Sequence, residues 1–175
     1  MAIFDLQNVY EGTFSITGQA WTGTDVTTNT TSYSSNVIDH NPTITPASGS
    51  GAGAAQNFST FGVGEPISVI LVVTAQPGHA SAETYTVNLL TDTATNLTTA
   101  PVTVATLSIP RTTTAGTGFI LPLPANTAFK RYSGLQYVLS NGGGTSALNV
   151  YAYMVATNSI PNTVNFQSGW QIQNS

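Results

Sequence analysis

The side chains able to carry out acid–base or nucleophilic chemistry are few and lie far apart in the sequence. His40 and His79 are the two histidines, and the chain has no cysteine. Ser81 is close to His79, but a nucleophilic serine also needs a base and an orienting group arranged around it. The sequence contains no Gly-x-Ser-x-Gly stretch that would hold such a serine on a tight turn. We therefore predict no catalytic residue and no enzymatic activity.

The acidic residues stand singly along the chain, whereas a metal site needs several histidine or carboxylate ligands that converge. The segment from Asp92 to Asn96 has neither the glycine nor the closing glutamate of a calcium-binding loop. Gly62 and Gly64 precede a predicted strand, so they do not form a dinucleotide-binding turn. We predict no metal and no cofactor. A glycosidase with two facing carboxylates stays open as a hypothesis, and its candidate acids are Asp39, Glu65, Glu83 and Asp92.

Several aromatic side chains could stack on sugar rings, although packing in a core or an interface is their more common role. They support a second hypothesis, a carbohydrate- or receptor-binding β-sandwich module. The candidate rings are Trp21, Trp170, Tyr132, Tyr137, Tyr151 and Tyr153.

The composition excludes several other classes of function. Seven acidic and three basic residues among 175 give a net charge of −4, and charged residues make up 6% of the chain, against about 25% in a typical domain. The place of charge is taken by 29 threonines, 16 serines and 14 asparagines. Three basic residues cannot line a nucleic-acid strand. The longest apolar run, residues 69–73, is far shorter than the ~20 residues that span a bilayer. We expect no nucleic-acid partner, no membrane partner and no secretory signal.

Short segments of alternating apolar and polar residues indicate an all-β protein of about eight strands. β-Branched residues are abundant, and no apolar stripe of helical spacing is sustained. One turn of helix is conceivable at residues 4–10. Even spacing and turn residues favour an antiparallel sandwich or barrel. The expected strands are 14–17, 33–39, 67–74, 84–89, 102–109, 119–123, 135–139 and 148–154, of which 67–74 is central and 119–123, with Pro122, is short or at an edge.

The domain prediction is one β-sandwich, residues 1–156, followed by an extension, residues 157–175. Residues 41–60 are rich in Gly, Ala, Ser and Pro and are expected to form a long surface loop. The extension is either an arm that packs on a neighbouring molecule or a tail that returns over its own domain. These two segments and residues 1–10 are the least needed by a core, so we expect binding contacts there.

An ordered set of short motifs between about Val9 and Ala156 resembles one known family. The motifs are SNVID (35–39), GVGEPI (62–67), SIP (108–110), FILPLP (119–124), RYSGLQY (131–137) and residues 147–156. They are similar to those of the capsid cement (decoration) proteins of tailed double-stranded DNA bacteriophages, a group that includes the Bordetella phage cement protein.

This resemblance implies a jelly-roll-like β-sandwich that binds the outer surface of a capsid built from a major capsid protein with the HK97-type fold. It also implies a homo-oligomer, either a dimer or a trimer, located in the virion after synthesis in the bacterial cytoplasm. It implies no enzymatic activity. The expected role is to cement neighbouring capsid subunits against the pressure of the packaged DNA.

Overall fold

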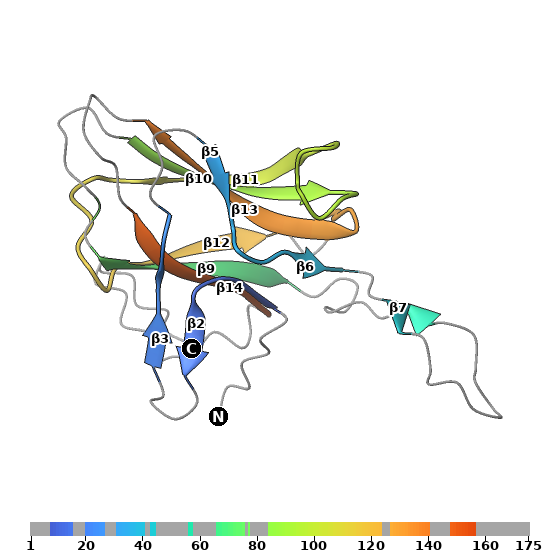
Figure 1. Cartoon of the computed structure of the whole chain (residues 1–175), viewed down its shortest axis with the longest axis horizontal. Helices are drawn as coiled ribbons and strands as arrows, with labels where there is room; N and C mark the ends of the chain where they lie inside the picture. Colours follow the sequence, from blue (N-terminus) through green and yellow to red (C-terminus); the bar gives the residue numbers. More distant parts are fainter. Residues whose placement is uncertain are drawn as a thin grey trace.

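The structure, a computed structural model, describes residues 8–15, 20–26, 31–40, 43–44, 56–57, 66–75, 77, 84–123, 127–140 and 148–156. These residues form antiparallel β-strands and contain no α-helix, which confirms the all-β prediction. Figure 1 shows two main sheets stacked face to face.

Five strands make up the first main sheet, and another five make up the second. The first runs in the order β1 (Val9–Glu11), β14 (Asn149–Ala156), β9 (Ile67–Ala75) and β12 (Gly118–Leu123), with β4 (Thr24–Asp25) also paired to β14. The second runs in the order β11 (Val102–Ile109), β10 (Thr84–Asp92), β13 (Tyr132–Ser140) and β5 (Thr31–Tyr33), with β6 (Ile38–Asp39) also paired to β13.

The strand orders are those of a jelly roll. If the eight strands β1, β5 and β9 to β14 are lettered B to I along the chain, the first sheet reads B-I-D-G and the second C-H-E-F. Most consecutive strands therefore lie in different sheets, and the chain crosses repeatedly over the core. The predicted jelly-roll-like sandwich of about eight strands is confirmed.

The core lies between the two sheets because one face of each long strand is apolar. On β10, Tyr85, Val87 and Leu89 are buried, and Leu135 and Tyr137 of the neighbouring β13 are fully buried on the same face. Strand β9 is buried on both faces from Ile67 to Val73, as its continuous apolar run predicts. Pro122 lies on β12 at the edge of its sheet, where no second strand in the described ranges needs its missing N–H.

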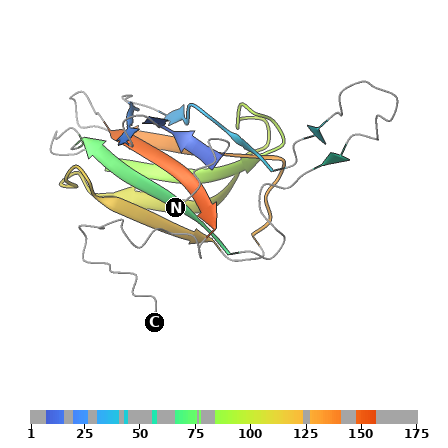
Figure 2. The same ribbon diagram turned by 90° about the horizontal axis from the view of Figure 1, so that it is seen from below.

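The outer face of the first sheet carries a second apolar cluster of Val9, Ile70, Val72 and Tyr153, against which Trp21, Tyr151 and Val155 pack. Trp21 belongs to a small hairpin of β2 (Thr13–Ser15) and β3 (Ala20–Thr22). Figure 2 shows the molecule turned by 90°, with these short N-terminal strands on one side of the sandwich. This cover explains why β9 has no polar face.

The sequence predictions fail where strands are short. Residues 33–39 do not form one strand, because the chain bends at Ser35 and is not paired as a strand between β5 and β6. The predicted strand 14–17 overlaps β2, and its remaining residues lie outside the described ranges. Of the turn of helix conceived for residues 4–10, Asn8 is in a 3-10 turn, but Val9 and Tyr10 are buried in β1. Residues 4–7 lie outside the described ranges.

Within the predicted surface loop 41–60, the structure describes two short strands that pair with each other, β7 (Thr43–Ile44) and β8 (Gln56–Asn57). They lie well to one side of the sandwich in Figure 1. The other residues of this loop, and the whole extension 157–175, lie outside the described residues, so the domain boundaries stay predictions.

Replacing Gly12 by alanine should destabilise the sandwich by roughly 2–3 kcal/mol. Gly12 has φ of +84°, and a Cβ there would lie 2.6 Å from Tyr151 Cβ and 2.7 Å from the backbone oxygen of Thr22. The turn from β1 to β2 cannot relax easily because one obstacle is backbone. Urea denaturation would measure the loss, and Gly116→Ala is the control: its φ is also positive, but a Cβ there meets open space. Equal losses in both variants would show that backbone strain alone matters.

Candidate docking face

The outer face of the second main sheet presents two rows of uncharged side chains. Tyr85, Val87 and Leu89 of β10 point into the core, so the alternate residues point outward. Strand register then fixes the rows across β11, β10, β13 and β5. The first row is Thr106, Asn88, Gln136 and Tyr33, and the second is Ser108, Thr86, Val138 and Thr31.

The first row is joined by hydrogen bonds from one side of the sheet to the other. The Thr106 hydroxyl donates to Asn88 Oδ1 at 2.9 Å, and Asn88 Nδ2 donates to Gln136 Oε1 at 2.9 Å. Gln136 Nε2 then donates to the Tyr33 hydroxyl at 3.3 Å. Thr106 is exposed, Tyr33 is 37% exposed, and the two amides are half-buried. This ladder holds four polar side chains in fixed positions on an open surface, which lowers the entropy cost of binding through them.

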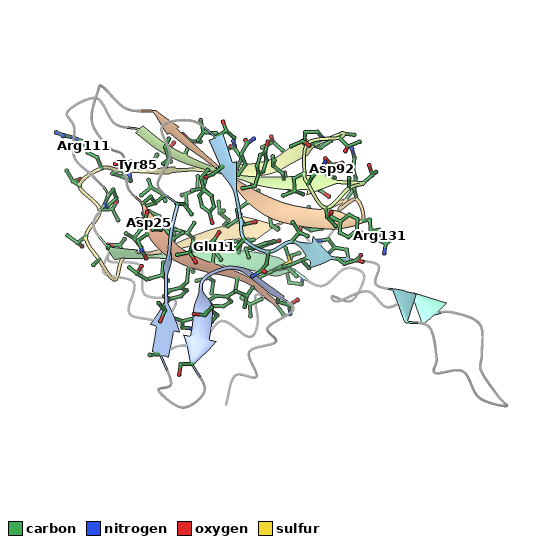
Figure 3. The ribbon with its side chains drawn as sticks, in the orientation of Figure 1. Glu11, Asp25, Tyr85, Asp92, Arg111 and Arg131 are labelled. Carbon is green, nitrogen blue, oxygen red and sulfur yellow. The ribbon has the colours of Figure 1, made fainter. Side chains whose placement is uncertain are left out.

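No side chain in the two rows is charged. Figure 3 shows Arg131 and Asp92 at one end of the sandwich, Arg111 at the opposite end and Glu11 between the sheets. Arg131 pairs with Asp39 at 3.1 Å, and its guanidinium lies 5.0 Å from the centre of the Tyr132 ring. A partner that docks on the two rows therefore has no ion to desolvate there.

A rigid loop closes one end of the face. Asp92 is fully buried, and its carboxylate accepts backbone N–H groups from Thr93, Ala94, Thr99 and Ala100 at 2.5–3.3 Å. Burial alone would raise the pKa of Asp92, but these N–H groups and the Thr93 hydroxyl outweigh it and hold the pKa below its usual value.

The tip of this loop packs on the sheet. Leu97 takes the left-handed conformation, with φ of 56°, and is fully buried. Its side chain lies over Gly134 of β13, where Val37 and Ser34 also approach and leave no space for a Cβ. At this end of the strands, the docking face is therefore bounded by the packing of Leu97 on Gly134.

Hydrogen bonds between Tyr10, Ser133 and His40 connect the two main sheets in the interior. The Tyr10 hydroxyl lies 2.8 Å from Ser133 Oγ, and His40 Nε2 lies 2.6 Å from the same oxygen. The His40 ring also stacks on Phe129, with 4.4 Å between ring centres. Burial lowers the pKa of His40 to about 4, although the carboxylate of Asp39 acts in the opposite direction. Burial likewise raises the pKa of Tyr10, so both groups are neutral near pH 7.

Acidification from pH 6.5 towards pH 4 should remove up to about 3 kcal/mol of stability through His40. The unfolded chain takes up this proton near the ordinary pKa of 6.5, while the folded protein takes it up near 4. The stabilisation is complete above the first value and is lost as the pH falls to the second. We expect urea denaturation at several pH values to show this slope in the wild type and a weaker one in His40→Gln, which can still bond Ser133. Identical slopes would contradict the assignment.

Glu11 is a buried carboxylate with a structural role. It accepts the Ser35 backbone N–H at 3.0 Å and the Ser35 hydroxyl at 2.5 Å, and it thereby fixes the segment between β5 and β6. Burial first, and then the negative charge of Glu11, raise the pKa of Tyr137 well above its ordinary value. No exposed reactive group results from this arrangement.

The rings proposed for sugar binding do not gather on one exposed surface. Tyr137 is fully buried in the core, and Tyr153 is 5% exposed. Trp21 stacks on Tyr151 and Tyr153, with ring centres 4.8 and 5.3 Å apart, so these rings cover one another. Tyr132 lies beside Arg131, and Trp170 is outside the described residues. The geometry therefore does not favour the carbohydrate-binding hypothesis.

The carboxylates proposed for a hydrolase are also occupied where the structure describes them. Asp92 binds the N–H groups of its own loop, and Asp39 pairs with Arg131; Glu65 and Glu83 lie outside the described residues. In the described ranges, no three His, Cys, Asp or Glu side chains are grouped closely enough to hold a metal ion. Likewise, no helix in this part of the chain has the length and apolar character needed to cross a membrane.

Sequence reasoning named none of the residues in the two rows as binding residues and therefore missed the docking face. The alternation of Thr84, Thr86 and Asn88 with apolar residues indicated that one side of this strand faces solvent. It gave no partner for Asn88, because Tyr33, Thr106 and Gln136 are separated from it by many residues. The segments expected to bind, 41–60, 157–175 and 1–10, lie mostly outside the described residues.

The described part of the chain is thus a jelly-roll β-sandwich with an uncharged, mostly polar outer face. Glu11, His40 and Asp92 are engaged in structural hydrogen bonds. A family model identifies it further: the Bbp16 model matches residues 15–154. The chain therefore belongs to the Bbp16 family, which indicates a bacteriophage structural protein. No curated protein matches the chain.

Proposed function

We propose that this protein is a capsid cement protein that binds the outer surface of a tailed-phage shell. Its partner would be the major capsid protein with the HK97-type fold, and it would act as a homo-oligomer in the virion without catalysing a reaction. The observation that carries this proposal is the uncharged hydroxyl–amide face, together with membership of the Bbp16 family. The ordered motifs shared with phage cement proteins give further support.

The chemistry of the face suits attachment in many adjacent copies. Hydroxyl and amide groups can exchange water for partner groups without the large desolvation cost of ions. The scarcity of charge also limits repulsion between neighbouring copies. Because the packaged DNA lies inside the shell, an acidic protein on the outside meets no phosphate. Binding only to the assembled lattice stabilises that lattice by mass action.

The test is to add purified protein to capsids that lack it. We expect saturable binding by co-sedimentation and a higher temperature of capsid rupture in bound particles. Monomeric, unassembled capsid protein is the matched control, and we expect much weaker binding to it. Absence of binding, or rupture at an unchanged temperature, would overturn the proposal. Capsids opened to expose their inner surface would show whether the protein binds inside instead.

A further inference from the structure

The four edges of the sandwich differ in how they are protected against pairing with another strand. An unpaired edge presents a row of backbone N–H and C=O groups, and proteins usually shorten, bulge or interrupt such edges. β1 has three residues and an irregular register, β5 also has three residues, and β12 contains Pro122. β11 has eight residues, no proline and no charged residue. On its outer side it pairs with no strand that the structure describes.

One irregularity divides this edge. The register with β10 shifts between Leu89 and Leu90, so Val104 has no partner on β10. Such a bulge twists the strand locally. The run Ala105–Ile109 beyond it is regular and pairs residue by residue with β10. A regular run of five residues therefore remains, whose outer side pairs with no described strand.

The side of the sandwich formed by the edge strands β11 and β12 is partly apolar. Val102 is 48% exposed, and Val104 and Leu107 are half-buried. Phe119 lies on β12, the edge strand of the other sheet, and is also half-buried. Covering these side chains would remove apolar area from water, which favours association by about 25 cal/mol per Å².

We infer that two copies of the chain associate by antiparallel pairing of their β11 edges around a two-fold axis at Leu107. In this register Thr106 faces Ser108 of the partner subunit, and Ala105 faces Ile109 of the partner subunit. Hydroxyl side chains therefore meet hydroxyl side chains on the outer face, and apolar side chains meet on the core face. The absence of charge on β11 allows the same edge to meet itself without repulsion.

Such pairing would make one continuous sheet and would place two docking faces side by side. An eight-residue strand is about 26 Å long, and the two sheets are about 10 Å apart. The surface that this edge can bury is therefore smaller than that of a standard interface, which is about 800 Å² per partner. We expect a dissociation constant in the micromolar range for the free protein. Association should be tighter on a surface that binds both copies at once. The inference names the contact for the homo-oligomer proposed above, but it concerns the free protein and needs no capsid.

The test uses two double substitutions at exposed positions. T106D/S108D places like charges opposite each other across the axis at both contacts. T106K/S108D places opposite charges there. Sedimentation of the free protein at concentrations up to about 1 mM should show a dimer for the wild type. We expect at least about 100-fold weaker association for T106D/S108D and association within about tenfold of the wild type for T106K/S108D.

T98D/T112D adds the same two charges at exposed loop positions and should dimerise like the wild type. A monomeric wild type, an unaffected T106D/S108D variant, or equal loss in both β11 variants would each overturn the inference. A monomeric wild type overturns the inference whatever T106D/S108D does to capsid binding, because Thr106 and Ser108 also belong to the two rows of the docking face. Since all dimer measurements use free protein, their failure leaves the capsid-binding proposal standing.

Discussion

The double substitution T86K/N88K on the docking face should weaken capsid binding by at least about 100-fold. Thr86 and Asn88 are neighbours on β10, one in each row of the face. Asn88 is the central member of the hydrogen-bonded ladder, between Thr106 and Gln136. Lysine at this position removes both links and brings an ammonium group into a contact that would otherwise contain no ions. An unpaired buried charge costs several kcal/mol, enough for this loss.

A matched variant separates loss of binding from loss of folding and from a change in net charge. T112K/T114K adds the same two charges at exposed positions of the loop between β11 and β12, outside the two rows. We expect it to bind capsids like the wild type in a co-sedimentation assay. Both variants should unfold cooperatively in urea, because none of the four side chains is buried in the core. If T86K/N88K binds normally while the wild type also binds, the attachment surface lies elsewhere on the protein.

The long strands could be predicted from the sequence because each one buries a clear face. Alternation located strands β9 to β14 to within a few residues, and Pro122 correctly indicated an edge. The pattern alone left a barrel open, and the jelly roll came from the resemblance to cement proteins. Strand order depends on pairings such as that of β1 with β14, whose residues are far apart in the sequence. Local patterns carry no information about such pairings.

The strands β1, β5 and β6 were missed or merged for a physical reason. β1 is three residues long and ends in Glu11, a charged residue that pattern reading places at the surface. Its burial is possible because Ser35 supplies two hydrogen bonds from a distant segment. The docking face was missed for a similar reason: its polar side chains are ordinary singly, and only the register brings them together.

Replacing Asp92 by asparagine should lower the unfolding temperature by on the order of 10 °C, the largest stability loss among the variants considered. The carboxylate accepts N–H groups on both oxygens, from Thr93 and Ala94 on one and Thr99 on the other, while Ala100 contacts both. An amide has one accepting oxygen, so its NH2 group must face N–H donors and leave them unsatisfied in a buried place. Leu97 would lose its position over Gly134, and the end of the docking face would become disordered.

Acid titration should identify this carboxylate specifically. Because the pKa of Asp92 is lower when folded than its ordinary 3.8, the unfolded chain takes up the proton first. Its stabilisation is present above that value and is lost as the pH falls through the folded pKa. Urea denaturation between about pH 5 and pH 2 should therefore show a steeper loss in the wild type than in Asp92→Asn. Asn96→Ala removes an exposed loop acceptor for Thr98 and should change neither slope nor stability much. If the acid slopes of wild type and Asp92→Asn coincide, the loop does not depend on a charged Asp92, and the docking face must be closed by the packing of Leu97 alone.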